Sequence, residues 1–172
     1  MSLNKERCSA EFILAMKFLT GRALNMEAII RTFTLLWKAV SGFKVRNVGD
    51  HILLFVYNNK EVVDKILKGE SWSFDKNLIV LQTYGNHSPV KGLKFSKVSL
   101  WIKLHDIPIC FMNRRVVEDL CSMIGEVDKT TNVVEMEGNG FMRVRVTIDV
   151  TLTLCQGRII YLEKGFEDWV TF

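Results

Sequence analysis

Two arginines and a phenylalanine recur at every second position in the segment FMRVRVTIDV, residues 141–150. Residues two apart share a face of a β-strand, so Phe141, Arg143 and Arg145 would lie together while the intervening aliphatic side chains enter a core. Aromatic rings and guanidinium planes stack on unpaired bases, and cations bind phosphates. This face of the predicted strand is therefore a candidate nucleic-acid contact.

Acidic residues around this strand support a second interpretation. Four acids lie nearby in the sequence: Asp128, Glu135, Glu137 and Asp149. Asn139-Gly140 predicts a hairpin turn directly before the strand. Across that turn, the arginines could pair with Glu135 or Glu137 and serve the hairpin alone. The sequence leaves both interpretations open, although the acids make this strand a poor landing site for phosphate.

Lysines make the middle of the chain its most basic part. Residues 76–105 contain five lysines and no acid, whereas residues 106–172 contain 7 basic and 11 acidic residues. The net charge is +4, so a polyanion would be drawn to the middle of the chain. The candidate contacts there are Lys91, Lys94, Phe95, Lys97 and Lys103. The alternative is a solvated basic linker with Phe95 anchored in the core.

Lys44 and Arg46 are further candidate phosphate contacts, because both lie on one side of a strand predicted over residues 43–48. Binding through such cations releases counterions and should weaken steeply as salt rises. Charge reversal of Lys91, Lys94 and Lys97 is expected to weaken binding more than charge reversal of Arg143 and Arg145.

Catalytic and metal-binding patterns are missing from the sequence. The four cysteines show no C-x-x-C spacing, and the three histidines complete no zinc-ligand pattern. Glu118 and Asp119 are adjacent on a predicted helix and do not converge on one point, and His105 stands at a strand end. We found no glycine-rich phosphate loop or nucleophile motif. We therefore expect a protein that is not an enzyme, holds no cofactor and takes no small-molecule substrate.

The first half of the chain predicts six elements in the order strand, helix, strand, strand, helix, strand. Apolar residues follow helical periodicity after Asn25, and Asn58 with Glu61 resembles a capping box before a second helix. Strands are expected over residues 11–20, 43–48, 51–57 and 78–84, the last preceded by Trp72-Ser73-Phe74 and a turn. This is the βαββαβ plan of ferredoxin-like folds and RNA-recognition motifs.

A basic linker is predicted over residues 85–97, and a second unit over residues 98–172. The second unit is expected to contain a strand at 98–104, a helix capped by Asn113, a hairpin of strands 126–136 and 141–150, and two closing strands. We therefore predict an α+β protein: a ferredoxin-like or RRM-like unit at 1–84, then a truncated βαβββ unit of similar plan. The sequence leaves open whether the two units pack as one body.

Apolar runs are too short and too often interrupted by charges for a membrane helix, and the N-terminal residues form no signal-peptide segment. An intracellular, soluble protein without membrane partners is expected. The four tryptophans, Trp37, Trp72, Trp101 and Trp169, are expected to lie mainly in cores.

A set of short motifs resembles a known family: Trp72-Ser73-Phe74, Leu100-Trp101-Ile102, Asp106-Ile107-Pro108, Ile124-Gly125, the 141–150 strand, and Trp169 to Phe172. Together they resemble the plant domain of unknown function found in retroelement-derived, gag-like proteins. Those are first open reading frame proteins of non-LTR retrotransposons. The resemblance implies RNA binding, packaging or chaperoning, with zinc held in a knuckle beyond the last strand. It also allows self-association, so a protein-interaction or assembly module is the alternative function.

Overall fold

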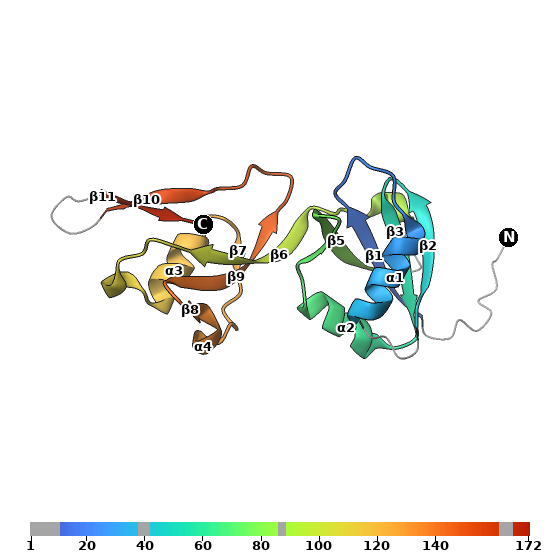
Figure 1. The fold of residues 1–172 in the computed structure, drawn as a ribbon, viewed down its shortest axis with the longest axis horizontal. Helices are drawn as coiled ribbons and strands as arrows, with labels where there is room; N and C mark the ends of the chain where they lie inside the picture. Colours follow the sequence, from blue (N-terminus) through green and yellow to red (C-terminus); the bar gives the residue numbers. More distant parts are fainter. Residues whose placement is uncertain (1–10, 38–41, 86–88, 162–166) are drawn as a thin grey trace. The chain divides into compact units, whose positions relative to one another are not determined.

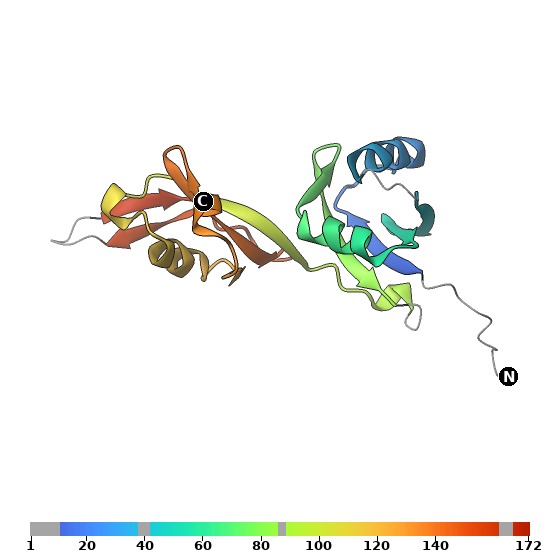
Figure 2. The ribbon, with the colours of Figure 1, turned by 90° about the horizontal axis from the view of Figure 1, so that it is seen from below.

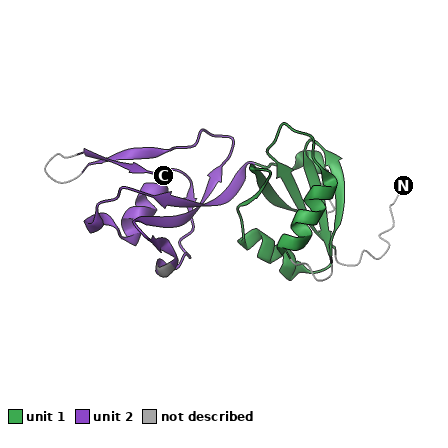
Figure 3. Ribbon diagram, viewed as in Figure 1, with its two compact units in different colours: residues 1–95 green, residues 96–172 purple. Residues whose placement is uncertain are grey.

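The computed structural model describes residues 11–37, 42–85, 89–161 and 167–172. The chain divides into two compact units, Met1–Phe95 and Ser96–Phe172 (Figure 3). Both units combine helices with antiparallel strands, which confirms the predicted α+β class. Of the described residues, none belongs to a helix with the length and apolar character needed to cross a membrane.

The first unit is an antiparallel sheet of five strands in the order β2-β3-β1-β5-β4 (Figure 1). Helices follow the first and third strands. The elements are β1 (Phe12–Phe18), α1 (Met26–Trp37), β2 (Lys44–Gly49), β3 (Ile52–Tyr57), α2 (Lys60–Lys68), β4 (Trp72–Phe74), β5 (Asn77–Tyr84) and the short helix η1 (Val90–Gly92).

Local sequence signals explain where these elements begin. The side chain of Asn25 accepts a hydrogen bond from Ala28 N at 3.1 Å and caps α1, as predicted. The cap of α2 is Asn59, one residue later than predicted, and it accepts from Glu61 N at 2.8 Å. The two hairpins turn at Asp50-His51 and Asp75-Lys76, where all four residues have positive φ, the signature of tight two-residue loops.

Both helices of the first unit pack on one face of its sheet. They bury a cluster that contains Ile29 and Phe33 of α1 and Val63 and Ile66 of α2 together with side chains of β1, β3 and β5. Aromatic side chains extend this core: Trp37 stacks on Phe33 with ring centroids 4.3 Å apart. Such burial supplies most of the stability that a unit of this size has.

The second unit is organised around β9 (Phe141–Asp149), which pairs antiparallel with three other strands. Its elements are β6 (Lys97–Leu104), the short helix η2 (Ile109–Phe111), α3 (Arg114–Cys121), β7 (Glu126–Val127), α4 (Val133–Met136), β8 (Glu137–Gly138), β9, β10 (Gly157–Tyr161) and β11 (Glu167–Thr171). Helix α3 packs against β9 (Figure 1), and β10 and β11 form a separate antiparallel pair, here called the β10–β11 ribbon.

The predicted strand over residues 126–136 is wrong for most of its length. β7 ends at Val127, and Val133–Met136 form the short helix α4. The side chain of Asp128 explains the end of the strand, because its Oδ1 accepts hydrogen bonds from Thr130 N at 2.9 Å and Thr130 Oγ1 at 2.6 Å. This local turn competes with pairing along β9.

The predicted linker, residues 85–97, contains regular structure in its described part. It includes η1 and, at its last residue, the first residue of β6. Figure 2 shows η1 on the opposite side of β1 from α1 within the first unit. The boundary between the two units falls between Phe95 and Ser96.

Candidate nucleic-acid interface

The outer face of the β6–β9 pair is a ladder of exposed and half-buried side chains. The inner face is apolar, because Val144, Val146 and Ile148 of β9 are buried in the core of the second unit. Residues paired on the outer face are Lys97 with Asp149, Ser99 with Thr147, Trp101 with Arg145, and Lys103 with Arg143. Alternation along both strands therefore places all eight side chains on one face.

Cations lie over aromatic rings on this face. Lys103 Nζ lies 4.9 Å from the centroid of the Phe141 ring, and the Arg143 guanidinium carbon lies 4.8 Å from the centroid of Trp101. We name the group formed by Trp101, Lys103, Phe141, Arg143 and Arg145 the cation–aromatic face. Each exposed cation–π contact contributes roughly 0.5–1 kcal/mol and fixes the orientation of a long side chain.

The contacts of the two arginines bear on the interpretation that they serve only the hairpin. Arg143 Nε donates a hydrogen bond of 2.7 Å to the main-chain carbonyl oxygen of Glu135. The acceptor of this bond is a neutral carbonyl group and not the carboxylate of Glu135. Hydrogen bonds from Thr130 are the main cause of the lowered pKa of Asp128, and the positive charge of Arg145 lowers that pKa further.

His105 extends the face at the end of β6. Its ring centroid lies 5.4 Å from that of Phe141, and its main chain pairs with Thr171 of β11. Three planar side chains, Trp101, Phe141 and His105, thus accompany the cations on one surface. This is the combination of charge and stacking groups that single-stranded nucleic acids bind.

Trp101 and Trp169 are not core residues, and the prediction for them is wrong. Their side chains are 36% and 51% exposed. Trp37 and Trp72, by contrast, pack against the core of the first unit as predicted. The reason is the phase of alternation: Val98 and Leu104 of β6 point inward, which turns Trp101 outward with Ser99 and Lys103.

Lys44 and Arg46 lie on β2, at the edge of the sheet in the first unit, and both are exposed. Their partners in register are Val56 and Leu54 of β3. The sheet face that they share is largely aliphatic: Ala15, Leu54, Val56 and Val80 are at most 6% exposed, and Lys17 and Gln82 are half-buried among them. In RNA-recognition motifs the corresponding face of the sheet is open and carries aromatic side chains that stack on bases. Lys44 and Arg46 lie instead at the edge of a face that is mostly buried.

The predicted lysine stretch is divided between the two units. Lys91 and Lys94 are exposed and Phe95 is half-buried in the first unit, whereas Lys97 is exposed at the start of β6 in the second. Among the residues proposed from sequence, the structure brings Lys97, Lys103, Arg143 and Arg145 onto one face. It does not bring Lys44 or Arg46 to that face, since β2 belongs to the other unit.

Ser99, Trp101, His105 and Thr147 lie on the outer face but were not among the contacts proposed from sequence, whereas Phe141 was expected on that face with Arg143 and Arg145. The alternation of the segment 98–104 contains the signal that could have found the β6 residues, since Trp101 is in phase with Lys103. Phe141 is in phase with Arg143 in the same way. His105 is in phase with Trp101 and Lys103, and the sequence places it at the strand end, but only the structure shows its ring beside Phe141.

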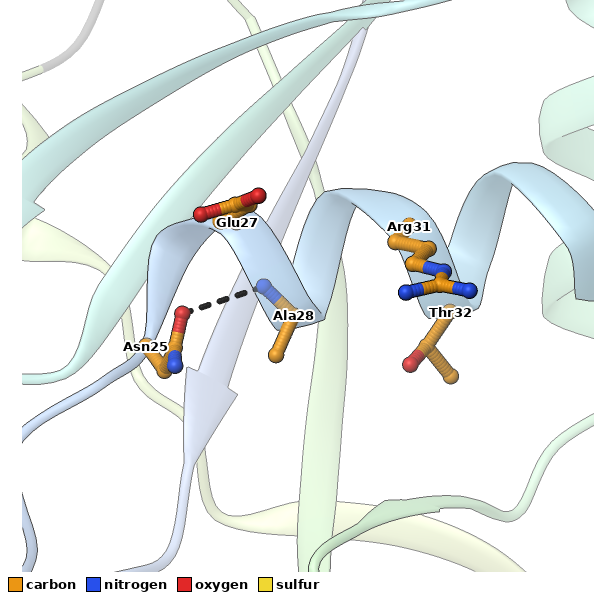
Figure 4. A pocket seen from close by; sticks show the side chains of 5 residues that line it. All are labelled: Asn25, Glu27, Ala28, Arg31 and Thr32. Carbon is orange, nitrogen blue, oxygen red and sulfur yellow. Dashed lines mark hydrogen bonds between the residues drawn. The ribbon is translucent and has the colours of Figure 1, made fainter.

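A hollow lies at the start of α1, beside the residue that caps this helix. It has a volume of about 240 Å³ and is lined by Asn25, Glu27, Ala28, Arg31 and Thr32. Figure 4 shows the Asn25 side chain bonded to Ala28 N. The Glu27 carboxylate at the same rim disfavours an anion there. Among residues 11–37, 42–85, 89–161 and 167–172, no group of three His, Cys, Asp or Glu side chains could hold a metal ion.

Comparison with known proteins identifies one family. The model of the domain of unknown function DUF4283 matches residues 7–89, just under half of the chain. The chain therefore contains this domain, and the match falls within the first unit. No curated protein matches the chain, and no solved structure does. The cation–aromatic face lies in the second unit, outside the matched residues.

Proposed function

We propose that this protein binds single-stranded nucleic acid, RNA foremost, through the cation–aromatic face, without an enzymatic step. The observation that carries the proposal is the alternation of cations with outward aromatic rings on β6 and β9, with Arg143 held over Trp101 and Lys103 over Phe141. Unpaired bases stack on such rings and on guanidinium planes, while the cations contact phosphates.

The surroundings of Arg143 favour binding over a purely structural role. The hydrogen bond from Nε to the carbonyl oxygen of Glu135 anchors the guanidinium. The other N–H donors of this side chain belong to the same planar group and are therefore held in place with it. A guanidinium that is already ordered loses little entropy when a base or phosphate contacts it. Trp101, at 36% exposure, presents part of its ring for the same purpose.

The location of the contact differs from the one favoured by charge counting. Lys91 and Lys94 carry charge, but Lys91 lies in the short helix η1 of the first unit and Lys94 follows that helix, next to the half-buried Phe95. The cation–aromatic face combines charge with exposed planar groups in a defined geometry. We propose it as the main site, with Lys97 as a flanking cation and Lys44, Arg46, Lys91 and Lys94 as weaker electrostatic contributors.

The test is the binding of a short fluorescent single-stranded RNA, followed by anisotropy in a salt titration. Affinity should fall steeply as salt rises, because phosphate contacts release counterions. Trp101→Ala should weaken binding by about 1–3 kcal/mol, the contribution of one stacked base. Trp169→Ala is the matched control, since Trp169 is an exposed tryptophan of the same unit that lies on β11.

Two charge-reversal variants locate the site. Lys103→Glu with Arg143→Glu should abolish binding, whereas Lys91→Glu with Lys94→Glu should weaken it less. The opposite ranking would place the contact in the lysine stretch. Absence of binding at low salt would reject the nucleic-acid proposal altogether.

A second candidate function is protein assembly, favoured by the β10–β11 ribbon. Ile159, Tyr161 and Trp169 are 45%, 76% and 51% exposed there. Ile159 and Trp169 are cross-strand partners, which places them on the same face of the ribbon. Exposed apolar and aromatic side chains in one place often mark a protein contact. Light scattering on the preparation used for RNA binding would detect self-association.

We further propose that the chain derives from a plant retroelement gag-like protein, in which a zinc knuckle supplies additional RNA contacts. The support is the resemblance in the strand motifs and the DUF4283 match. Sequencing the full transcript would test this proposal: a Cys/His knuckle encoded directly after Phe172 is expected, and an unrelated continuation would contradict it.

A further inference from the structure

A polar hollow borders the cation–aromatic face. It has a volume of about 310 Å³ and is lined by Ser99, Glu126, Val127, Asp128, Lys129 and Thr147. Ser99 and Thr147 are the next cross-strand pair after Trp101 and Arg145. A base that follows one stacked on Trp101 along a bound strand would therefore reach this hollow.

Hydroxyl and carboxylate groups both line the polar hollow. The hydroxyls of Ser99 and Thr147 are 2.9 Å apart, and either can donate. Asp128 is oriented by Thr130, whose two hydrogen bonds both go to Oδ1. Those bonds lower the pKa of Asp128, so this side chain is ionised at neutral pH and accepts hydrogen bonds without donating any. The two carboxylates, Glu126 and Asp128, outnumber the one cation of the lining, Lys129, so the hollow disfavours phosphate and suits a different part of a nucleotide.

The exocyclic amino groups of bases are the donors that suit such a carboxylate. Cytosine and adenine each carry an amino group beside a ring nitrogen that accepts, so the carboxylate could take the amino hydrogen while a hydroxyl donates to the nitrogen. Uracil presents its one N–H between two carbonyl oxygens, which a carboxylate repels.

We propose that the polar hollow binds the Watson–Crick edge of cytosine or adenine, and that the protein therefore prefers single strands of these bases over uracil. This inference rests on the proposed nucleic-acid function and adds base selection to it. The acidic side chains that disfavour phosphate near this strand would then select the base by accepting hydrogen bonds from it.

The experiment compares equal-length, fluorescently labelled single strands of cytidine, adenosine and uridine, bound to the full chain at low salt with EDTA. Cytidine and adenosine strands should bind at least about fivefold more tightly than uridine strands, the lower end of discrimination by a good base contact. Asp128→Asn should reduce that ratio toward one, because an amide donates as readily as it accepts.

Asp149→Asn is the matched control. Asp149 lies on the same outer face, and its Oδ1 is bonded by Thr151 N and Oγ1 as Asp128 is by Thr130, but it does not line the hollow. Both variants remove one negative charge, which should favour binding of a polyanion. Asp149→Asn should strengthen binding to all strands alike, whereas Asp128→Asn should also lose the base contact and so lower the ratio. Ser99→Ala provides a second variant and should also reduce the ratio.

The possible failures are distinguishable. Equal affinity for the three strands, with binding still lost in the Lys103→Glu/Arg143→Glu variant, would overturn the base preference and leave the proposed function standing. The same change of ratio in Asp149→Asn and Asp128→Asn would also overturn it, since charge alone would then explain the effect. Absence of binding to every strand would reject both proposals.

Discussion

Cysteine side chains in this protein differ in how deeply they are buried. Cys121, the last residue of α3, is buried in the core of the second unit, whereas Cys110 and Cys155 are exposed. Two of the cysteines that the structure describes are thus accessible to solvent. Desolvation raises the pKa of Cys121 from 9.0 to about 12, because a thiolate is poorly solvated in an apolar core.

The three thiols within the described residues should react differently with iodoacetamide at pH 8. Cys110 and Cys155 should be alkylated quickly, and Cys121 only after denaturation, as peptide mass spectrometry would show. Rapid alkylation of Cys121 in the native protein would contradict its burial.

The raised pKa of Cys121 also has a consequence for stability. Above pH 9 the unfolded chain loses the thiol proton while the folded chain keeps it, so the free energy of unfolding should fall as pH rises from about 9 to 12.

At the scale of elements, β7 depends on a close approach that a glycine permits. A Cβ added to Gly125 would lie 2.3 Å from the carbonyl oxygen of Thr147 in β9, and this atom belongs to the backbone. The glycine thus lets the segment before β7 pass against β9, where Glu126 pairs with Thr147. The polar hollow is built on this contact, since it includes residues of both strands.

Gly125→Ala should lower the free energy of unfolding of the second unit by about 1–3 kcal/mol, the usual cost of overpacking. Gly92→Ala is the control, because a Cβ at Gly92 meets no atom within 4 Å. Thermal or denaturant unfolding measures both. Equal effects of the two substitutions would mean that β7 does not rest on this approach.

At the scale of the whole molecule, each unit has a core of its own. Side chains of β1, β3 and β5 with α1 and α2 form the core of the first, and side chains of β6, β9 and α3 form that of the second. The DUF4283 domain corresponds to the first unit, while the proposed binding face belongs to the second. We expect the two units to lose their structure independently when one core is damaged.

Phe55→Ala tests this independence. Phe55 is fully buried in the first unit, and its removal should cost about 3–5 kcal/mol there. Hydrogen exchange should then accelerate in β1, β3 and β5 and stay unchanged in β6 and β9. Val144→Ala should have the converse effect, because Val144 is buried in the second unit. Faster exchange throughout the chain after either substitution would show that the units are coupled.

Alternation and capping signals were enough to predict most elements of the fold. The 141–150 strand, the helix after Asn25 and the strand 98–104 all carry strong periodicity, and the structure has elements at these places. Predictions failed where short-range chemistry competed with pattern. The Asp128 turn ended a strand that its apolar neighbours suggested, and side-chain hydrogen bonds of this kind have no periodic signal.

The sequence by itself determined that Phe141, Arg143 and Arg145 share one face, because the period of a strand is two. Only the tertiary structure decided what that face carries. Pairing of β6 with β9 brought Trp101 and Lys103 beside the arginines, and packing of α3 against β9 left this face open to solvent. Register between distant strands depends on burying one apolar face of each, and this long-range condition turned a pair of arginines on one strand into a surface of alternating cations and rings.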